Sequence, residues 1–152
     1  MAKRKIVQFG DDTLRRVCRP VDTITPSILT LLDDMAETMH AADGVGLAAP
    51  QVGVLRRIAI VEVEPGQLIE LINPKIIARA GEQEGSEGCL SLPNQYGMVK
   101  RPMHVTVRAT DRYGKEFEMN GSELLARAFC HEIDHLDGHL FIDIAEYMED
   151  AE

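Results

Sequence analysis

The sequence predicts an α+β fold in which mainly antiparallel sheets pack around a central helix that carries an HExxH motif. Two observations support this prediction. Segments with helical periodicity occur near both ends of the chain, and the segments between them alternate like strands separated by turns. The 152 residues contain no internal repeat, low-complexity stretch or linker, so we expect one domain that spans residues 1–152.

Residues 26–42 are expected to form the first long helix. Thr25 is suited to the N-cap, and Pro26 then takes the first helical position, where its missing N–H costs nothing. Apolar side chains recur at helical spacing and should face the core: Ile28, Leu31, Leu32, Met35 and Met39. Before this helix, residues 11–16 are typical of a short helical turn, to which we assign no function.

The middle of the chain is expected to supply the sheet. Strands are predicted at 57–63, 68–72, 75–80, 104–110 and 115–119, with a turn at 111–114 before the last of them. Since these strands follow one another between two helices, the sheet should be mainly antiparallel.

The second helix is predicted from Ser122 to about His135. Ser122 is the candidate N-cap, Glu123 suits the positive end of the helix dipole, and Gly138 is a plausible residue to end the helix. His131 and His135 are four residues apart, so both imidazoles lie on one helix face and can point at one metal ion. The alternative is two solvated histidines on an ordinary amphipathic helix.

Glu132 completes the HExxH motif. It lies about 100° around the helix from His131, which puts its carboxylate beside such a metal rather than on it. From there it could act as a general base towards a metal-bound water. The motif therefore supplies two ligands and a base, and leaves the third ligand open.

Two residues compete for that third ligand, and the metzincin arrangement is excluded. A metzincin protease would place a histidine where this chain has Phe141. Glu146 is the nearest downstream carboxylate and lies in 144–148, a candidate short terminal helix. Cys89, within EGCLS, is the better candidate, because thiolates bind divalent transition metals strongly. Its alternative role is that of a buried structural thiol.

Residues 44–51 read GVGLAAPQ and superficially satisfy the dinucleotide fingerprint G-x-G-x-x-A. That fingerprint needs a preceding strand and a following helix, whereas here a helix precedes it and Pro50 follows. We interpret it instead as a glycine turn whose backbone can approach a ligand and which carries Gln51 into a site.

The order GVGLAAPQ, EGCLS, HEIDH resembles that of the bacterial-type peptide deformylases, and the resemblance covers residues 44–141. It implies one catalytic domain in which Cys89, His131 and His135 hold a divalent transition metal. Fe²⁺ is implied in cells, with Zn²⁺, Ni²⁺ or Co²⁺ as substitutes. Many deformylases carry Gln where this chain has Cys130, which should face away from the site as a packing residue.

The resemblance also implies the reaction. A metal-bound hydroxide would attack the formyl carbon of an N-formylmethionyl peptide and release formate, with Glu132 as general base and then acid. The Gln51 amide and the Leu90 backbone N–H would stabilise the oxyanion. The methionine side chain would enter a pocket lined by Val45, Leu124 and Ala128, while the backbone of Gly44, Val45 and Gly46 would pair with the extended peptide. Arg127 either borders the site or lies in solvent.

Composition excludes several other classes. The net charge of −9 argues against direct nucleic-acid binding, and the nearest approaches to a basic patch, Arg56-Arg57 and Lys100-Arg101, are expected to be solvated or salt-bridged. No window suits a membrane span or a signal peptide. Three cysteines suit a reducing compartment, so we expect a cytoplasmic protein.

The short acidic tail lacks the basic helix with which some deformylases dock on the ribosome, so we expect at most transient ribosome proximity. Oligomeric state is left unassigned. Two rivals remain: an endopeptidase that uses Glu146, and a metal-binding module with a closed, non-catalytic site.

Overall fold

The computed structural model describes residues 2–150, which form two antiparallel sheets and two α-helices. The larger sheet has the order β1-β2-β3-β6-β7, with bounds Gly46–Ala48, Ile58–Val61, Ile69–Ala80, His104–Thr110 and Glu116–Ser122. The smaller has the order β4-β5-β8, with bounds Gln83–Cys89, Leu92–Arg101 and Tyr147–Asp150. The helices are α1 (Pro26–Ala41) and α2 (Leu124–Leu136), with 3₁₀ turns at Asp12–Arg15 (η1), Ala49–Val52 (η2) and Phe141–Asp143 (η3). The predicted α+β class is confirmed.

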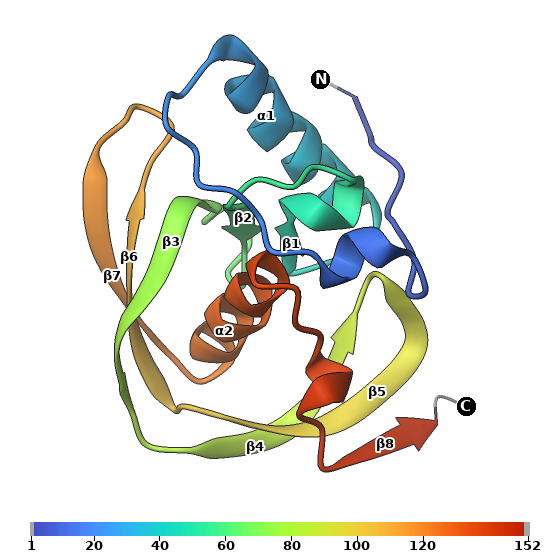
Figure 1. Cartoon of the computed structure of the whole chain (residues 1–152). Helices are drawn as coiled ribbons and strands as arrows, with labels where there is room; N and C mark the ends of the chain where they lie inside the picture. Colours follow the sequence, from blue (N-terminus) through green and yellow to red (C-terminus); the bar gives the residue numbers. More distant parts are fainter. Residues whose placement is uncertain (1, 151–152) are drawn as a thin grey trace.

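Helix α2 lies at the centre of the molecule, with β3, β6 and β7 on one side and the β4–β5 hairpin curving below it (Figure 1). Its Phe129 is fully buried and packs in one core cluster with Leu71, Val105 and Val107 of the larger sheet. Because a side chain as large as Phe stabilises by about 1.5–3 kcal/mol when buried, this cluster fixes α2 firmly against the sheet.

Helix α1 begins as the sequence predicts. The Thr25 hydroxyl accepts a hydrogen bond from the Ile28 N–H, and Pro26 opens the helix. The predicted apolar stripe is buried in a second core cluster that also contains Leu47, Ile58 and Ile60. α1 thereby covers the start of the larger sheet, next to the segment that leads into β1. The short turn expected near residue 12 is also present, as η1.

The predicted cap of the second helix is wrong. Ser122 ends β7, where it pairs with His104, and its hydroxyl lies 2.7 Å from His104 Nδ1 across the two strands. The N-cap is Glu123, whose φ is 56° and whose side chain makes no capping bond. Strand pairing therefore uses the hydroxyl that the sequence offered as a cap. At the other end Gly138 has a φ of 78°, as a helix-ending glycine should, and a Cβ there would meet the Arg15 carbonyl oxygen at 2.5 Å.

The strands predicted at 68–72 and 75–80 form one strand, β3, whose register shifts between Ile72 and Lys75 and again between Ile76 and Ala78. Asn73, with a φ of 52°, and Pro74, which has no N–H to donate, account for the first irregularity. The strands at 57–63, 104–110 and 115–119 are confirmed as β2, β6 and β7 with small shifts in their ends. β1, β4, β5 and β8 were not predicted.

The terminal helix expected at 144–148 is wrong. η3 ends at Asp143, and the chain then joins the smaller sheet, because the Glu146 N–H donates to Met98 O and β8 pairs with β5. No helix within residues 2–150 has the length and apolar character that crossing a membrane would require.

Candidate metal centre

Three side chains from two distant parts of the chain meet at one point. Cys89, at the end of β4, and His131 and His135, on α2, place one ligand atom each within 4.8 Å of one another. Cys89 Sγ lies 3.4 Å from His135 Nε2. His135 is almost fully buried, His131 is buried and Cys89 is partly buried. The structure therefore brings together all three predicted ligands.

Phe141, which stands at the position of the metzincin histidine, and Glu146, the weaker candidate ligand, have other roles. Phe141 is buried and stacks on the His131 ring, with ring centroids 6.1 Å apart and an interplanar angle of 24°. Glu146 lies at the surface, where its carboxylate pairs with Lys100 at 3.0 Å, and it is not part of the metal-ligating group within residues 2–150. The geometry thus favours Cys89 over both.

Glu87 holds His131 in place, and it was missed by the sequence reasoning. Its Oε1 lies 2.7 Å from His131 Nδ1, which leaves Nε2 of that ring to face Cys89. Arg101 binds the same carboxylate through two bonds of 2.8 Å, and Arg127 adds a contact of 2.7 Å. Arg101 also pairs with Asp134 at 2.6 Å. We call these five residues the Glu87 network.

The charges of the Glu87 network interact strongly because they are buried, and these interactions shift the pKa values of Glu87 and His131. Burial by itself would raise the pKa of Glu87, but the Arg101 and His131 hydrogen bonds and charges hold it far below its usual range. Burial would lower the pKa of His131, but the carboxylate of Glu132, the Cys89 sulfur and Glu87 raise it well above its ordinary value. Arg127 is buried, so the alternative that it lies in solvent is wrong.

Glu132 lies beside the ligands and has room only because position 46 is glycine. A Cβ at Gly46 would overlap the Glu132 carboxylate. Glu132 Oε1 is buried and has no hydrogen-bond partner among the described residues, and the same is true of His135 Nδ1. Burial raises the pKa of Glu132 to about 7. An unpaired carboxylate oxygen next to one thiol and two imidazoles fits a transition metal with a water bound to it.

His135 differs from His131 in its protonation. Burial and the nearby charge of His131 keep the pKa of His135 well below its ordinary value. It is therefore a neutral imidazole near pH 7, which is the form that binds a metal.

The first glycine of GVGLAAPQ brings the first two motifs together. A Cβ at Gly44 would lie 2.8 Å from Leu90 Cδ1, so a side chain here would have to push Leu90 aside where this turn packs against the EGCLS segment. Further along, Gln51 is buried. Its side-chain oxygen accepts from the Ala48 N–H at 2.9 Å, and its amide donates to Cys89 Sγ at 3.4 Å and Ser91 Oγ at 3.2 Å. As expected, the turn carries Gln51 to the site.

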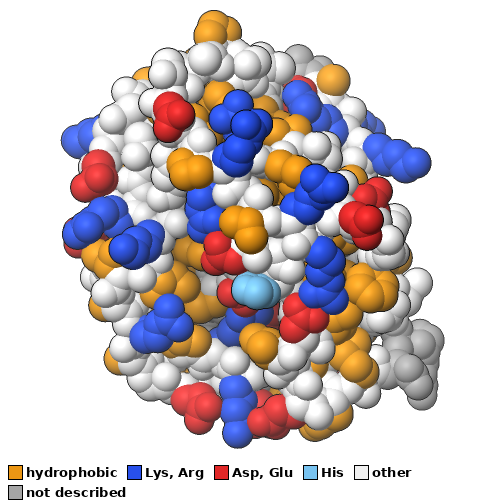
Figure 2. Space-filling view, in the orientation of Figure 1, with side chains coloured by type: hydrophobic (Ala, Val, Ile, Leu, Met, Phe, Trp, Pro, Cys, Tyr) orange, Lys and Arg blue, Asp and Glu red, His pale blue; other side chains and the backbone are white. Residues whose placement is uncertain are grey.

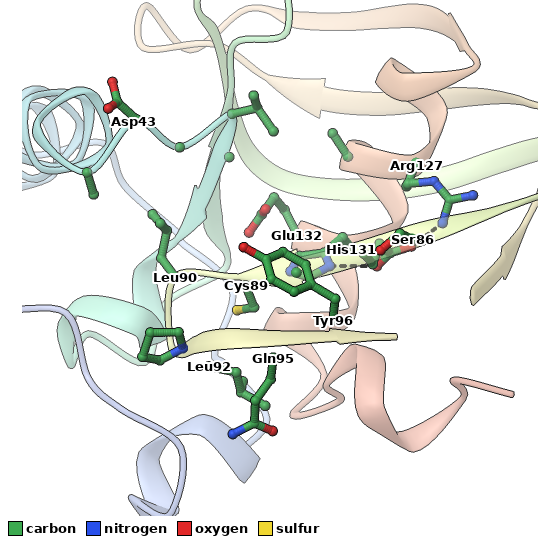
Figure 3. Close-up of a pocket in the computed structure, with 18 of the residues that line it drawn as sticks. Asp43, Ser86, Cys89, Leu90, Leu92, Gln95, Tyr96, Arg127, His131 and Glu132 are labelled. Carbon is green, nitrogen blue, oxygen red and sulfur yellow. Dashed lines mark hydrogen bonds and ion pairs between the residues drawn. The ribbon is translucent and has the colours of Figure 1, made fainter. Parts of the chain in front are cut away.

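A cavity of about 490 Å³ opens onto this centre. Figure 3 shows Cys89, His131 and Glu132 close together in the cavity, with Leu90 on one side and Arg127 on the other. Every other residue proposed from the sequence except His135 also lines it: Gly44, Val45, Gly46, Gln51, Leu124 and Ala128. Ala128 is buried, whereas Val45 and Leu124 are exposed at the rim. The sequence reasoning missed Leu92, Gln95 and Tyr96 of β5, because that strand was not predicted.

The comparisons with known proteins agree with this geometry. The family model described as polypeptide deformylase matches residues 3–151. A peptide deformylase of Thermoanaerobacter pseudethanolicus is 56% identical over all of this chain and 95% of its own length. One from Lachnoclostridium phytofermentans is 56% identical over 94% of this chain and 89% of its own.

Solved structures give the same result. A peptide deformylase from Legionella pneumophila superposes with a TM-score of 0.92 at 46% identity, covering 95% of this chain and 87% of that one. One from Synechococcus elongatus in complex with actinonin gives 0.90 at 39% identity, covering 97% and 85%. Sequence, fold and family model together show that this chain belongs to the polypeptide deformylase family of enzymes.

Proposed function

We propose that the protein hydrolyses the N-formyl group of N-formylmethionyl peptides at the Cys89, His131 and His135 centre, releasing formate and a free amino terminus. Family membership supports removal of formyl groups from nascent peptides in general. The observation that carries the assignment to this site is one thiol and two imidazoles within 4.8 Å, beside the unpartnered Glu132 carboxylate and at the wall of a cavity.

The donor set fits a divalent transition metal held by Cys89, His131 and His135. His131 would give up a proton when the metal binds, and a thiolate with two neutral imidazoles suits Fe²⁺, Zn²⁺, Ni²⁺ and Co²⁺ alike. We propose Fe²⁺ in cells, because the resemblance to deformylases implies it, with the others as substitutes in purified samples. When bound, such an ion polarises a carbonyl oxygen and lowers the pKa of water towards neutrality.

Glu132 acts as the proton carrier in this proposal. Its ionised carboxylate takes a proton from the attacking water and later delivers that proton to the departing amine nitrogen, as the C–N bond of the formamide breaks. Two features of the structure support this role. Its Oε1 is free of other partners, and the pKa of about 7 in the metal-free protein lies near the working pH.

The oxyanion that forms on the formyl oxygen needs donors from the protein. We propose the Gln51 side-chain amide, which already lies against Cys89 Sγ, and the Leu90 backbone N–H, one residue further along. Removing one donor of this kind typically costs about 2.7–4 kcal/mol of transition-state stabilisation.

The substrate backbone has a natural partner in the segment from Gly44 to Gly46. β1 is the first strand of the larger sheet and pairs only with β2 among the described strands, so an extended peptide can add along its other edge. The methionine side chain would then enter the cavity between Val45, Leu124 and Ala128. We propose that the chain acts as one catalytic domain in the cytoplasm, where nascent chains arise, with only transient ribosome proximity.

The test is formate release from formyl-Met peptides under anaerobic conditions, with metal analysis of the same sample. Wild type should release formate, Glu132→Gln should keep its metal without turnover, and Cys89→Ala should lose both. Cys130→Ala is the matched control, because it removes a buried thiol from α2 that lies in the core cluster rather than in the metal-ligating group. Full activity of Cys89→Ala would disprove the proposed centre. Cleavage of internal bonds in unformylated peptides would favour the endopeptidase instead.

A further inference from the structure

A second cavity, of about 540 Å³, lies on the other side of α2. We call it the rear cavity. Its wall on α2 is formed by Cys130, Ile133 and Asp134, whereas the active-site cavity uses Ala128, His131 and Glu132 of the same helix. The rest of the lining comes mainly from β3, the end of β5 and the segment after α2, together with Arg57.

Both basic pairs that stood out in the sequence contribute to this cavity. Arg57 comes from one pair and Lys100 and Arg101 from the other, and β3 adds Lys75 and Arg79. Figure 2 shows Lys and Arg side chains interspersed with acidic ones over one face of the molecule, rather than segregated into one block. The rear cavity thus has a local excess of Lys and Arg side chains, although the net charge of the chain is −9.

The acidic side chains of the rear cavity are already neutralised. Asp134 pairs with Arg101 at 2.6 Å and Asp137 pairs with Arg57 at 2.8 Å. Asp143 pairs at 2.6 Å with Arg15, which lies outside the cavity. None of the three is left to repel an incoming anion with its full charge.

The remaining cations are available. Lys75 and Arg79 are exposed and form no ion pair with any side chain of residues 2–149. Lys100 is half-exposed and has one partner, Glu146, which is itself 40% exposed. In contrast, Arg101 is buried and bound by Glu87 and Asp134. An anion entering from solvent would therefore meet Lys75, Arg79 and Lys100 first.

The size and walls of the cavity narrow the class of ligand. A volume of about 540 Å³ is in the range of small-molecule sites and far exceeds what one inorganic anion fills. Ile76, Ile133, Leu140 and Ile144 add apolar surface to the lining. Arg and Lys bind phosphate oxygens through charge-assisted hydrogen bonds. We propose that the rear cavity binds a small organic molecule that carries phosphate groups, with the phosphates on Lys75, Arg79 and Lys100 and its body against the apolar walls.

ADP and inorganic pyrophosphate are suitable probes, titrated by calorimetry into the metal-loaded full chain. ADP should bind, and more tightly than pyrophosphate, because only ADP has a body for the apolar walls. Lys75→Gln/Arg79→Gln should weaken the binding of ADP by at least about tenfold, because it removes two charge-assisted hydrogen bonds to the phosphates. The control is Lys115→Gln/Arg19→Gln, which removes the same charge from exposed positions outside the cavity.

Four outcomes would overturn the proposal. These are no ADP binding at millimolar concentration, pyrophosphate binding as tightly as ADP, equal weakening in both double variants, or full ADP affinity in Lys75→Gln/Arg79→Gln. The last result would mean that the phosphates bind elsewhere, for instance on the metal. Because both substituted side chains are exposed on β3, the variant should fold and should release formate at the wild-type rate, which serves as its integrity check.

Discussion

Glu87→Gln removes one charge from the centre of a buried network while keeping the shape of the side chain. The carboxylate makes four close contacts: two with Arg101 at 2.8 Å, one with Arg127 at 2.7 Å and one with His131 at 2.7 Å. After the substitution Arg101 still has Asp134 at 2.6 Å. Arg127 loses its carboxylate partner and keeps only neutral acceptors, among them the backbone carbonyls of Val99 at 3.1 Å and Gly85 at 3.4 Å.

The loss of stability in Glu87→Gln depends on which buried charge loses its partner. Breaking a buried ion pair by removing one partner typically costs about 3–5 kcal/mol, and Arg127 is the group that becomes uncompensated. The contact with His131 has a separate consequence. Loss of a partner that orients a metal ligand typically lowers metal affinity by about 10–100-fold. We therefore expect Glu87→Gln to lower both the free energy of unfolding and the affinity for metal.

The two effects can be measured independently. Urea unfolding of the metal-free protein gives the change in stability, and competition with a chelator gives the metal dissociation constant. Glu118→Gln is the matched control, because its carboxylate binds Arg108 on the exposed surface and should affect neither. If Glu87→Gln lowered stability but left the metal dissociation constant unchanged, the argument that Glu87 orients His131 would be refuted.

Three further predictions concern the same centre. Gly46→Ala should lower the rate of formate release by about 100-fold, because the new methyl group displaces the Glu132 carboxylate and a small misplacement of a catalytic group can cost that much. Turnover at the wild-type rate would contradict this prediction. Chelation should lower the thermal unfolding midpoint of wild type but not of Cys89→Ala, since a ligand at 1,000 times its dissociation constant stabilises by about 4 kcal/mol. In the metal-free state, the stability of wild type relative to Glu132→Gln should fall by about 3 kcal/mol as pH rises from 4.5 to 7, because the pKa of Glu132 is raised from 4.5 to about 7 and the folded state disfavours its ionised form. This contribution is fully present below pH 4.5. Urea unfolding of both proteins across this range measures the difference, which cancels the titration of His135 because both proteins contain it, and a difference that does not change with pH would contradict the prediction.

The part of the site that depends on local spacing was predictable. His131, Glu132 and His135 lie on one helix, where a separation of four residues fixes which side chains share a face. Cys89 was chosen over Glu146 mainly through the resemblance of three motifs in order, since no local rule joins a strand end to a helix. The structure brings Cys89 to the two histidines and leaves Glu146 at the surface.

The Glu87 network could not be derived in the same way. Residues 83–89 are rich in glycine and glutamate and lack the apolar alternation of a strand, so β4 was not predicted. Had it been, its period of two would have put Glu87 on the same side as Cys89. Ser122 failed for a related reason. Its hydroxyl could cap a helix, but Ser122 instead pairs with His104 across two strands, and the hydroxyl then contacts the His104 ring.

The separation of the ligands along the chain also bears on how the protein folds. The two histidines come together as soon as α2 forms, whereas Cys89 is 46 residues from His135 and reaches it only when the β4–β5 hairpin docks. Because closing such a loop costs conformational entropy before any contact compensates for it, the three-ligand site should form late in folding. The rate of metal uptake by the refolding chain would then report docking of the hairpin.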